Sequence, residues 1–149
     1  MKVVSKNSDG RNYTAVEVGK MSELSQYTLV LSPEIQIPGK VFLGTLLGTT
    51  GAEISFQSFA PNSETGFLHT HKTHEELYIF VSGKGEFQVD DKVFTITEGS
   101  VVKVAPEGRR SVRNNSDEPL VMICVQYKAN AFSPDDVTDG MILSDKVKW

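Results

Sequence analysis

The stretch that decides the fold lies near the middle of the chain and reads Phe67-Leu-His69-Thr-His71-Lys-Thr-His74-Glu75-Glu76-Leu-Tyr78-Ile-Phe80-Val-Ser-Gly83. It contains all three histidines of the 149-residue protein. His69 and His71 are two positions apart, so an extended strand would project both imidazoles to the same face. After a polar break, Glu76 leads into an apolar run over residues 77–81 that predicts a second strand. Two imidazoles and a carboxylate on neighbouring strands are a typical ligand set for a divalent transition metal with open coordination positions.

Other interpretations of these residues stay open. The three histidines could cluster on a solvated loop, with the two acids as an ordinary polar corner. The apolar strand that follows argues against this, because at least one face of the hairpin is then covered. Glu75 would face away from Glu76 on a strand and is interpreted as a solvated charge. His74 is interpreted as a surface or rim residue, or as an acid or base near neutral pH.

The stretch resembles the first sequence signature of the cupin superfamily, in which a His-x-His pair is followed by a glutamate and then a glycine. Here four residues separate His71 from Glu76, and six separate Glu76 from Gly83. The leading glycine of the signature is out of register, since Gly66 lies only three positions before His69. The resemblance implies that His69, His71 and Glu76 hold a divalent metal such as Fe, Mn, Ni or Zn.

A second segment is similar to the second cupin signature, over residues 99–115. It departs from the signature in having one extra residue between Gly99 and Pro106. It also has Ser111 where the family has its fourth ligand, a histidine. Together the two signatures and the link between them extend from about residue 66 to residue 115, a third of the chain. They indicate the fold more specifically than the activity.

Short alternating or apolar segments separated by turn residues predict an all-β sandwich or barrel. About eight or nine strands are expected, over residues 41–47, 53–59, 67–71, 77–81, 86–89, 92–96, 100–104, 111–114 and 120–127. The resemblance narrows this to a cupin-type jelly-roll barrel. We expect one domain over residues 1–149, with a barrel core at about 41–128, an extended N-terminal arm at 1–40 and a C-terminal tail at 129–149. The arm could pack on the sheet or reach a second subunit.

Composition excludes several classes of protein. Hydrophobic residues at 39% and charged residues at 23% are ordinary for a globular domain. A formal charge of −4 argues against a nucleic-acid surface, and no apolar run approaches membrane-spanning length. The single cysteine, Cys124, lies in an apolar strand and fits a buried thiol in a reducing compartment, so we expect a cytoplasmic protein.

The inward positions of neighbouring strands in a barrel share one cavity. If Glu76 points inward, alternation places Tyr78 and Phe80 inside with it, which makes them candidate substrate contacts. Alternation from Ser111 places Arg113 on the same side, and both are candidate substrate contacts, with the planar guanidinium of Arg113 suited to an anionic group. The alternative for Arg113 is an ion pair with an acid on the outer face. Tyr78 and His74 are the candidates for moving protons.

Ser111 is a weak ligand for a divalent ion, and three outcomes follow. His69, His71 and Glu76 could hold the metal with waters, His74 could substitute as a ligand, or the site could be metal-free, in that order of preference. We therefore expect a small cupin that binds a divalent metal and acts on or binds a small polar molecule, anionic or sugar-like. The resemblance would allow dioxygenase, isomerase or lyase chemistry, and it implies a homodimer. The alternative is a non-catalytic metabolite- or carbohydrate-binding protein.

Overall fold

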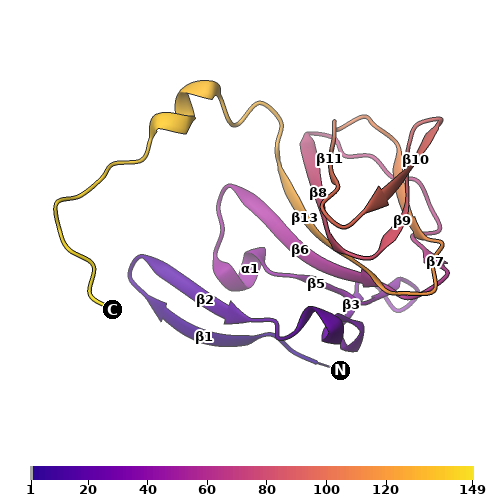
Figure 1. Ribbon diagram of the computed structural model, residues 1–149, viewed down its shortest axis with the longest axis horizontal. Helices are drawn as coiled ribbons and strands as arrows, with labels where there is room; N and C mark the ends of the chain where they lie inside the picture. Colours follow the sequence, from indigo (N-terminus) through magenta and orange to yellow (C-terminus); the bar gives the residue numbers. More distant parts are fainter. Residues whose placement is uncertain (1) are drawn as a thin grey trace.

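The computed structural model describes residues 2–149, and nearly all of its regular structure is β-strand (Figure 1). The strands are β1 (Ser5–Gly10), β2 (Tyr13–Glu17), β3 (Thr28–Val30), β4 (Gln36–Pro38), β5 (Lys40–Phe42), β6 (Ala52–Phe59), β7 (Ser63–Glu64), β8 (His74–Ser82), β9 (Lys84–Val89), β10 (Lys92–Thr97), β11 (Val101–Val104), β12 (Arg110–Asn114) and β13 (Leu120–Lys128). Short helical turns occur at η1 (Met21–Gln26), α1 (Gly44–Leu47) and η2 (Pro134–Thr138). No helix within residues 2–149 is long and apolar enough to span a bilayer.

Two antiparallel sheets form the jelly roll. One has the strand order β11-β8-β13-β6-β5, and the other has the order β10-β9-β12-β7. Strand β8 alternates between buried and less buried positions, so that Tyr78 and Phe80 point toward the opposite sheet. There they pack with Phe87 of β9 and Val112 of β12 in the main hydrophobic core. The predicted all-β jelly roll is therefore confirmed.

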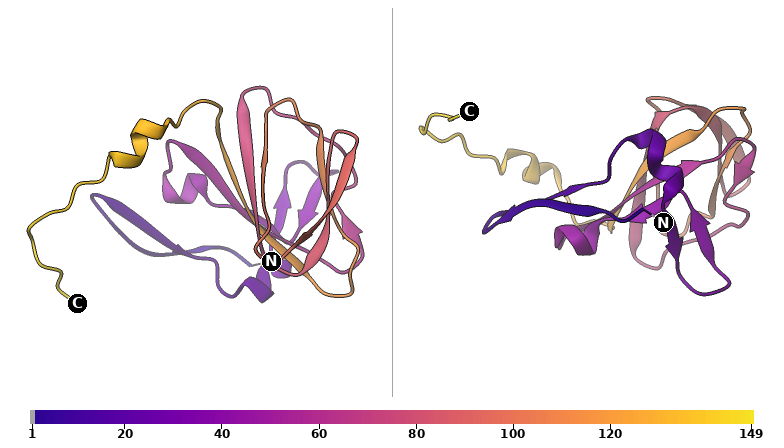
Figure 2. Two further views of the ribbon diagram at one scale, coloured as in Figure 1. Left: turned by 45° about the horizontal axis from the view of Figure 1, so that its top comes forward. Right: turned by 90° about the horizontal axis from the view of Figure 1, so that it is seen from below.

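The N-terminal arm covers the outer face of the five-stranded sheet. A second hydrophobic cluster joins Leu24 and Tyr27 of the arm to Val121 of β13, which points away from the main core. The Tyr27 hydroxyl donates a hydrogen bond to the carbonyl of Val18 at 2.9 Å, which closes this cluster. The β1–β2 hairpin instead extends beyond the sheet, and the C-terminal tail leaves the barrel as an extended segment (Figure 2). Part of the arm thus packs on its own sheet, an option that the sequence left open.

Two predicted strands are wrong. The run 41–47 divides into β5 and the helical turn α1, because the carboxylate of Glu53 accepts a hydrogen bond from the Gly44 N–H at 2.6 Å. Gly48 then ends the turn in the left-handed region at a φ of 69°, which glycine adopts without a steric penalty. The run 67–71 is extended but makes only an isolated bridge, between His69 and Arg110.

Candidate metal centre

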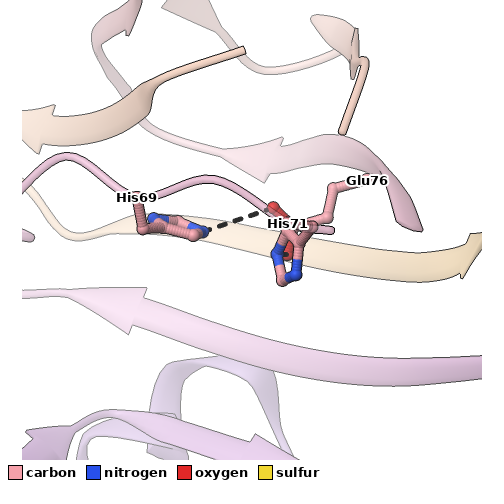
Figure 3. A group of neighbouring side chains, drawn as sticks. All are labelled: His69, His71 and Glu76. Carbon is pink, nitrogen blue, oxygen red and sulfur yellow. Dashed lines mark ion pairs between the residues drawn. The ribbon is translucent and has the colours of Figure 1, made fainter. Parts of the chain in front are cut away.

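The imidazoles of His69 and His71 and the carboxylate of Glu76 converge on one point inside the barrel (Figure 3). One ligand atom from each residue lies within 4.8 Å of the others. His69 Nε2 is 3.5 Å from Glu76 Oε2, and His71 Nε2 is 3.2 Å from Glu76 Oε1. These distances bring the three predicted ligands close enough for a single ion to contact all of them.

Backbone hydrogen bonds to the first residue of β12 and to the loop before it hold the two histidines in place. The N–H of His69 donates to the Arg110 carbonyl at 3.2 Å, and the Arg110 N–H donates back to the His69 carbonyl at 3.0 Å. The N–H of His71 donates to the Pro106 carbonyl at 2.9 Å. The extended segment therefore presents both imidazoles on one side, as the two-residue spacing predicts, although it is not part of a regular sheet.

The ring of His71 is half-buried between Gln126 and Glu76. Its Nδ1 lies 2.9 Å from the side-chain amide nitrogen of Gln126, which donates to Nδ1 in this orientation. An amide turned by 180° would instead accept a proton from Nδ1 and leave the Nε2 lone pair toward Glu76. Nε2 is buried and has no hydrogen-bond partner within residues 2–149. Burial lowers the pKa of His71, against the opposing effect of the Glu76 charge. A neutral imidazole with a free, buried nitrogen is the form that binds transition metals.

Glu76 is an ionised carboxylate in an almost fully buried position. Burial by itself raises its pKa, but hydrogen bonds from His69 and Tyr78, the charge that His71 carries when it is protonated in acid, and the charge of Arg110 outweigh this and bring the pKa to about 2. The Tyr78 hydroxyl donates to Oε2, and the Cys124 thiol lies 3.5 Å from Oε1. Oε2 is thus held by the protein, and Oε1 faces His71 as the oxygen available to a cation.

A buried arginine, which the sequence analysis did not single out, completes the site. The side chain of Arg110 is 0% exposed, and its Nε lies 3.2 Å from Glu76 Oε2 as an ion pair without hydrogen-bond alignment. Its terminal nitrogens donate to the carbonyls of Gly108 at 2.9 Å, Pro106 at 3.3 Å and His69 at 3.4 Å. Arg110 therefore compensates the charge of Glu76 and ties the histidine segment to the loop before β12.

The side-chain phase predicted for β12 is wrong by one residue. The inward set is Arg110, Val112 and Asn114, all buried, so Arg110 rather than Ser111 has the inward position next to the histidines. Ser111 borders both the cavity at the histidine cluster and a groove of about 350 Å³ on the outer faces of β9 and β10, whereas Arg113 lines only the groove. Arg113 pairs there with Glu86, and its side chain is 53% exposed. Val112 was the sequence signal for the correct phase, because it is the apolar residue of this strand.

Of the other residues that the sequence predicted for the site, Tyr78 lies in it, whereas Phe80 and His74 lie outside it. Tyr78 lines the cavity and contacts Glu76. Phe80, 1% exposed, packs edge-to-face on Phe87 in the core and does not line the cavity. His74 begins β8 on the same face as Glu76, but it is exposed and its Nδ1 contacts the Thr73 hydroxyl at 3.2 Å. It does not belong to the His69–His71–Glu76 cluster.

The cluster opens into a cavity of about 1420 Å³, large enough for a small organic molecule. Its walls include inward-facing polar residues of β5, β6 and β13 that the sequence analysis did not propose as site residues. These are Lys40, Glu53, Ser55, Gln57, Cys124 and Gln126. Burial, with the nearby charge of Glu76, raises the pKa of the Cys124 thiol to about 12, so this cysteine is a neutral wall residue.

Comparisons with known proteins agree with the fold and with the first signature. The family model described as "Cupin domain" matches residues 55–126. An uncharacterized protein of Methanocaldococcus jannaschii, MJ1618, is 27% identical over 71 residues, which are 48% of this chain and 57% of that protein. This chain thus matches little more than half the length of that relative.

Solved structures extend the similarity to most of the chain. A protein of Klebsiella pneumoniae with a double-stranded β-helix domain shares the fold at 18% identity and a TM-score of 0.57, over 77% of this chain and 92% of that one. A cupin protein of Bacteroides fragilis is 30% identical, with a TM-score of 0.66, over 77% of this chain and 94% of that chain. With both signatures, the jelly roll and this relative in agreement, the chain belongs to the cupin family.

Proposed function

We propose that this protein binds one divalent transition metal through His69, His71 and Glu76, and that the ion and the cavity together receive a small polar molecule. The observation that carries the proposal is the convergence of two imidazoles and an ionised carboxylate at the wall of a large cavity. A nitrogen and oxygen donor set of this kind suits Fe, Mn, Ni or Zn. When bound, such an ion supplies Lewis acidity or activation of oxygen.

The protein's own residues would prepare the site for such an ion. Gln126 fixes the ring of His71, and Tyr78 holds one oxygen of Glu76. Burial, with the charge of Glu76, raises the pKa of Tyr78, so this phenol stays protonated at neutral pH and acts as a hydrogen-bond donor. His74, exposed near the start of β8, remains the candidate for moving a proton between solvent and the cavity. The reaction classes compatible with the family remain dioxygenase, isomerase and lyase.

Metal content of two histidine variants tests the metal proposal. Purified protein is incubated with Fe²⁺, Mn²⁺, Ni²⁺ or Zn²⁺, desalted and measured by elemental analysis. We expect about one ion per chain in the unmodified protein and in His74→Ala, which removes an exposed histidine outside the cluster. We expect little or none in His71→Ala, because this change removes a ligand. Full metal retention in His71→Ala would reject the ligand assignment.

A non-catalytic, metal-free binding protein is the second candidate, and one observation favours it. Arg110 already neutralises Glu76 from the inward face of β12, and its positive charge opposes a second cation nearby. For this candidate, the unmodified protein would take up none of the four ions and would still bind small molecules in the cavity. If metal is present, oxygen consumption and product analysis with small acids and sugars distinguish an enzyme from a binder.

A further inference from the structure

Lys40 lies on the cavity wall across from the histidine cluster and is not accounted for by the metal proposal. It belongs to β5, the edge strand, and pairs in register with Gln57 of β6. Its Nζ contacts the neutral amide oxygen of Gln57 at 3.2 Å and lies 5.3 Å from the ring centre of Phe42. Both partners are uncharged, and within residues 2–149 no ion pair of Lys40 is formed with a carboxylate.

The charged ammonium group of Lys40 is partly removed from water, which destabilises the fold unless an anion compensates the charge. Burial lowers the pKa of Lys40, and the nearby Cys124 and Glu76 side chains offset only part of this effect. Glu76 is already paired with Arg110 on the far side of the cavity. An anionic group of a bound molecule would provide the missing compensation, as charge-assisted hydrogen bonds to ammonium groups do.

Buried polar side chains surround Lys40, at positions that apolar residues usually occupy in a protein interior. Gln57 and Ser55 are buried on β6 and line the same cavity. Because the Gln57 oxygen accepts from Lys40, its amide N–H groups remain donors for a second acceptor. One ammonium and one amide together match a carboxylate, which has one charge and two acceptor oxygens, better than a phosphate dianion.

The arrangement across the sheet separates this pair from the metal ligands. Strands β5, β6, β13 and β8 are neighbours in that order, and Lys40 is level with Phe80 of β8, four residues along that strand from Glu76. Side chains reach into the cavity from both ends of this span. The acids at the cavity rim, Glu34, Glu64 and Glu118, are solvent-exposed, so their repulsion of an anion is screened.

We propose that Lys40 and Gln57 form a carboxylate-binding subsite, and that the molecule received by this protein is a small organic acid whose other polar end faces His69, His71 and Glu76. This inference deepens the proposed function. Only the contact between the other end of the acid and the His69–His71–Glu76 cluster rests on that function. The carboxylate contact at Lys40 and Gln57 can exist with or without a metal, so the two can be tested separately.

The test is calorimetric titration of the full-length protein with succinate, L-malate and pyruvate, alongside uncharged succinamide and inorganic phosphate. We expect at least one carboxylate to bind and succinamide not to bind. Lys40→Met keeps the length of the side chain and removes its charge, and it should weaken carboxylate binding by about 10- to 100-fold. The matched control is Lys92→Met, since Lys92 is exposed at the start of β10 and lies outside the cavity lining. It should leave the affinity unchanged.

Several results would overturn the inference. These are equal carboxylate affinity in Lys40→Met, no binding by any of the three acids, and Lys40-dependent binding of phosphate alone. The melting temperature of Lys40→Met should equal or exceed that of the unmodified protein, because a half-buried charge without a carboxylate partner is removed. A large decrease would assign Lys40 to fold stability instead. Gln57→Leu provides a second variant and should also weaken carboxylate binding.

Metal content measured on the same samples separates the two proposals. Lys40→Met should retain the metal content of the unmodified protein, because Lys40 does not contact the three proposed ligands. Lys40-dependent carboxylate binding in a protein that takes up no metal would support the subsite and reject the metal site. Metal uptake together with carboxylate binding that does not depend on Lys40 would support the metal site and reject the subsite.

Discussion

Replacing Arg110 by methionine tests how the buried charges of the site are balanced. At 3.2 Å and an effective dielectric constant of ~20, the attraction between Arg110 and Glu76 is about 5 kcal/mol. Methionine fills much of the volume but leaves the Glu76 carboxylate buried without its cation and the carbonyls of Gly108 and Pro106 without their donor. Breaking a buried pair in this way costs about 3–5 kcal/mol. For a protein of this size that corresponds to a fall of about 6–20 °C in melting temperature.

The same substitution should improve metal binding. If a divalent ion bound at about 6 Å from the guanidinium, it would be repelled by about 1.4 kcal/mol even at the dielectric constant of water. Removing that charge should therefore raise the metal affinity by about tenfold or more. The ion would also compensate the buried, unpaired charge of Glu76, so added Zn²⁺ or Mn²⁺ should raise the melting temperature of Arg110→Met by more than that of the unmodified protein.

Differential scanning fluorimetry with and without metal, combined with calorimetric titration of metal, measures both effects. Arg109→Met is the matched control, because Arg109 is the exposed neighbour, 3.4 Å from Asp91 and 3.7 Å from Asp90. It should change neither the melting temperature nor the metal affinity beyond experimental error. An Arg110→Met protein with unchanged stability would refute the role of Arg110 as the partner of Glu76. Reduced stability with unchanged or weaker metal binding would refute the electrostatic argument for the ion.

Four further predictions concern other parts of the molecule. The pKa of Glu76 in the folded protein is lowered to about 2, so its charge stabilises the fold at pH values above the unfolded pKa of 4.5. About 3 kcal/mol of the free energy of unfolding should be lost as the pH falls from 4.5 toward 2. Chemical denaturation of Glu76→Gln should show less of this pH dependence. Leu24→Ala should lower the free energy of unfolding by about 2–5 kcal/mol in urea titrations, because Leu24 of the N-terminal arm is fully buried against the sheet. The control Leu143→Ala, in the exposed tail, should have no effect. Cys124 should react with a disulfide reagent at least ~100-fold more slowly in the native protein than in urea, because its side chain is buried and its pKa is raised to about 12. Equal rates in the two conditions would contradict the buried position of Cys124. Light scattering should give the mass of a homodimer, as exposed sheet edges favour association, and a monomer over the whole concentration range would contradict this prediction.

Some features of this protein could be predicted from local sequence pattern. Alternation of apolar and polar residues predicted strands such as β6 and β8, because the period of two depends only on the backbone of an extended chain. The same rule predicted that His69 and His71 share a face, and the apolar run after Glu76 predicted that this carboxylate is on a neighbouring strand. The structure brings these three residues together even though the histidine segment is not in a sheet.

Other features depended on contacts between distant segments. The inward position of Arg110 is set by its backbone bridge to His69, 41 residues earlier in the chain, and a shift of one residue reverses which side chains of β12 face inward. Lys40 lies on a three-residue strand that is too short to show a period, so its side chain is directed into the cavity only by pairing with Gln57 on β6. Sequence pattern thus determined which residue types carry the metal-binding chemistry, whereas strand register, a property of the tertiary structure, decided which cations surround them.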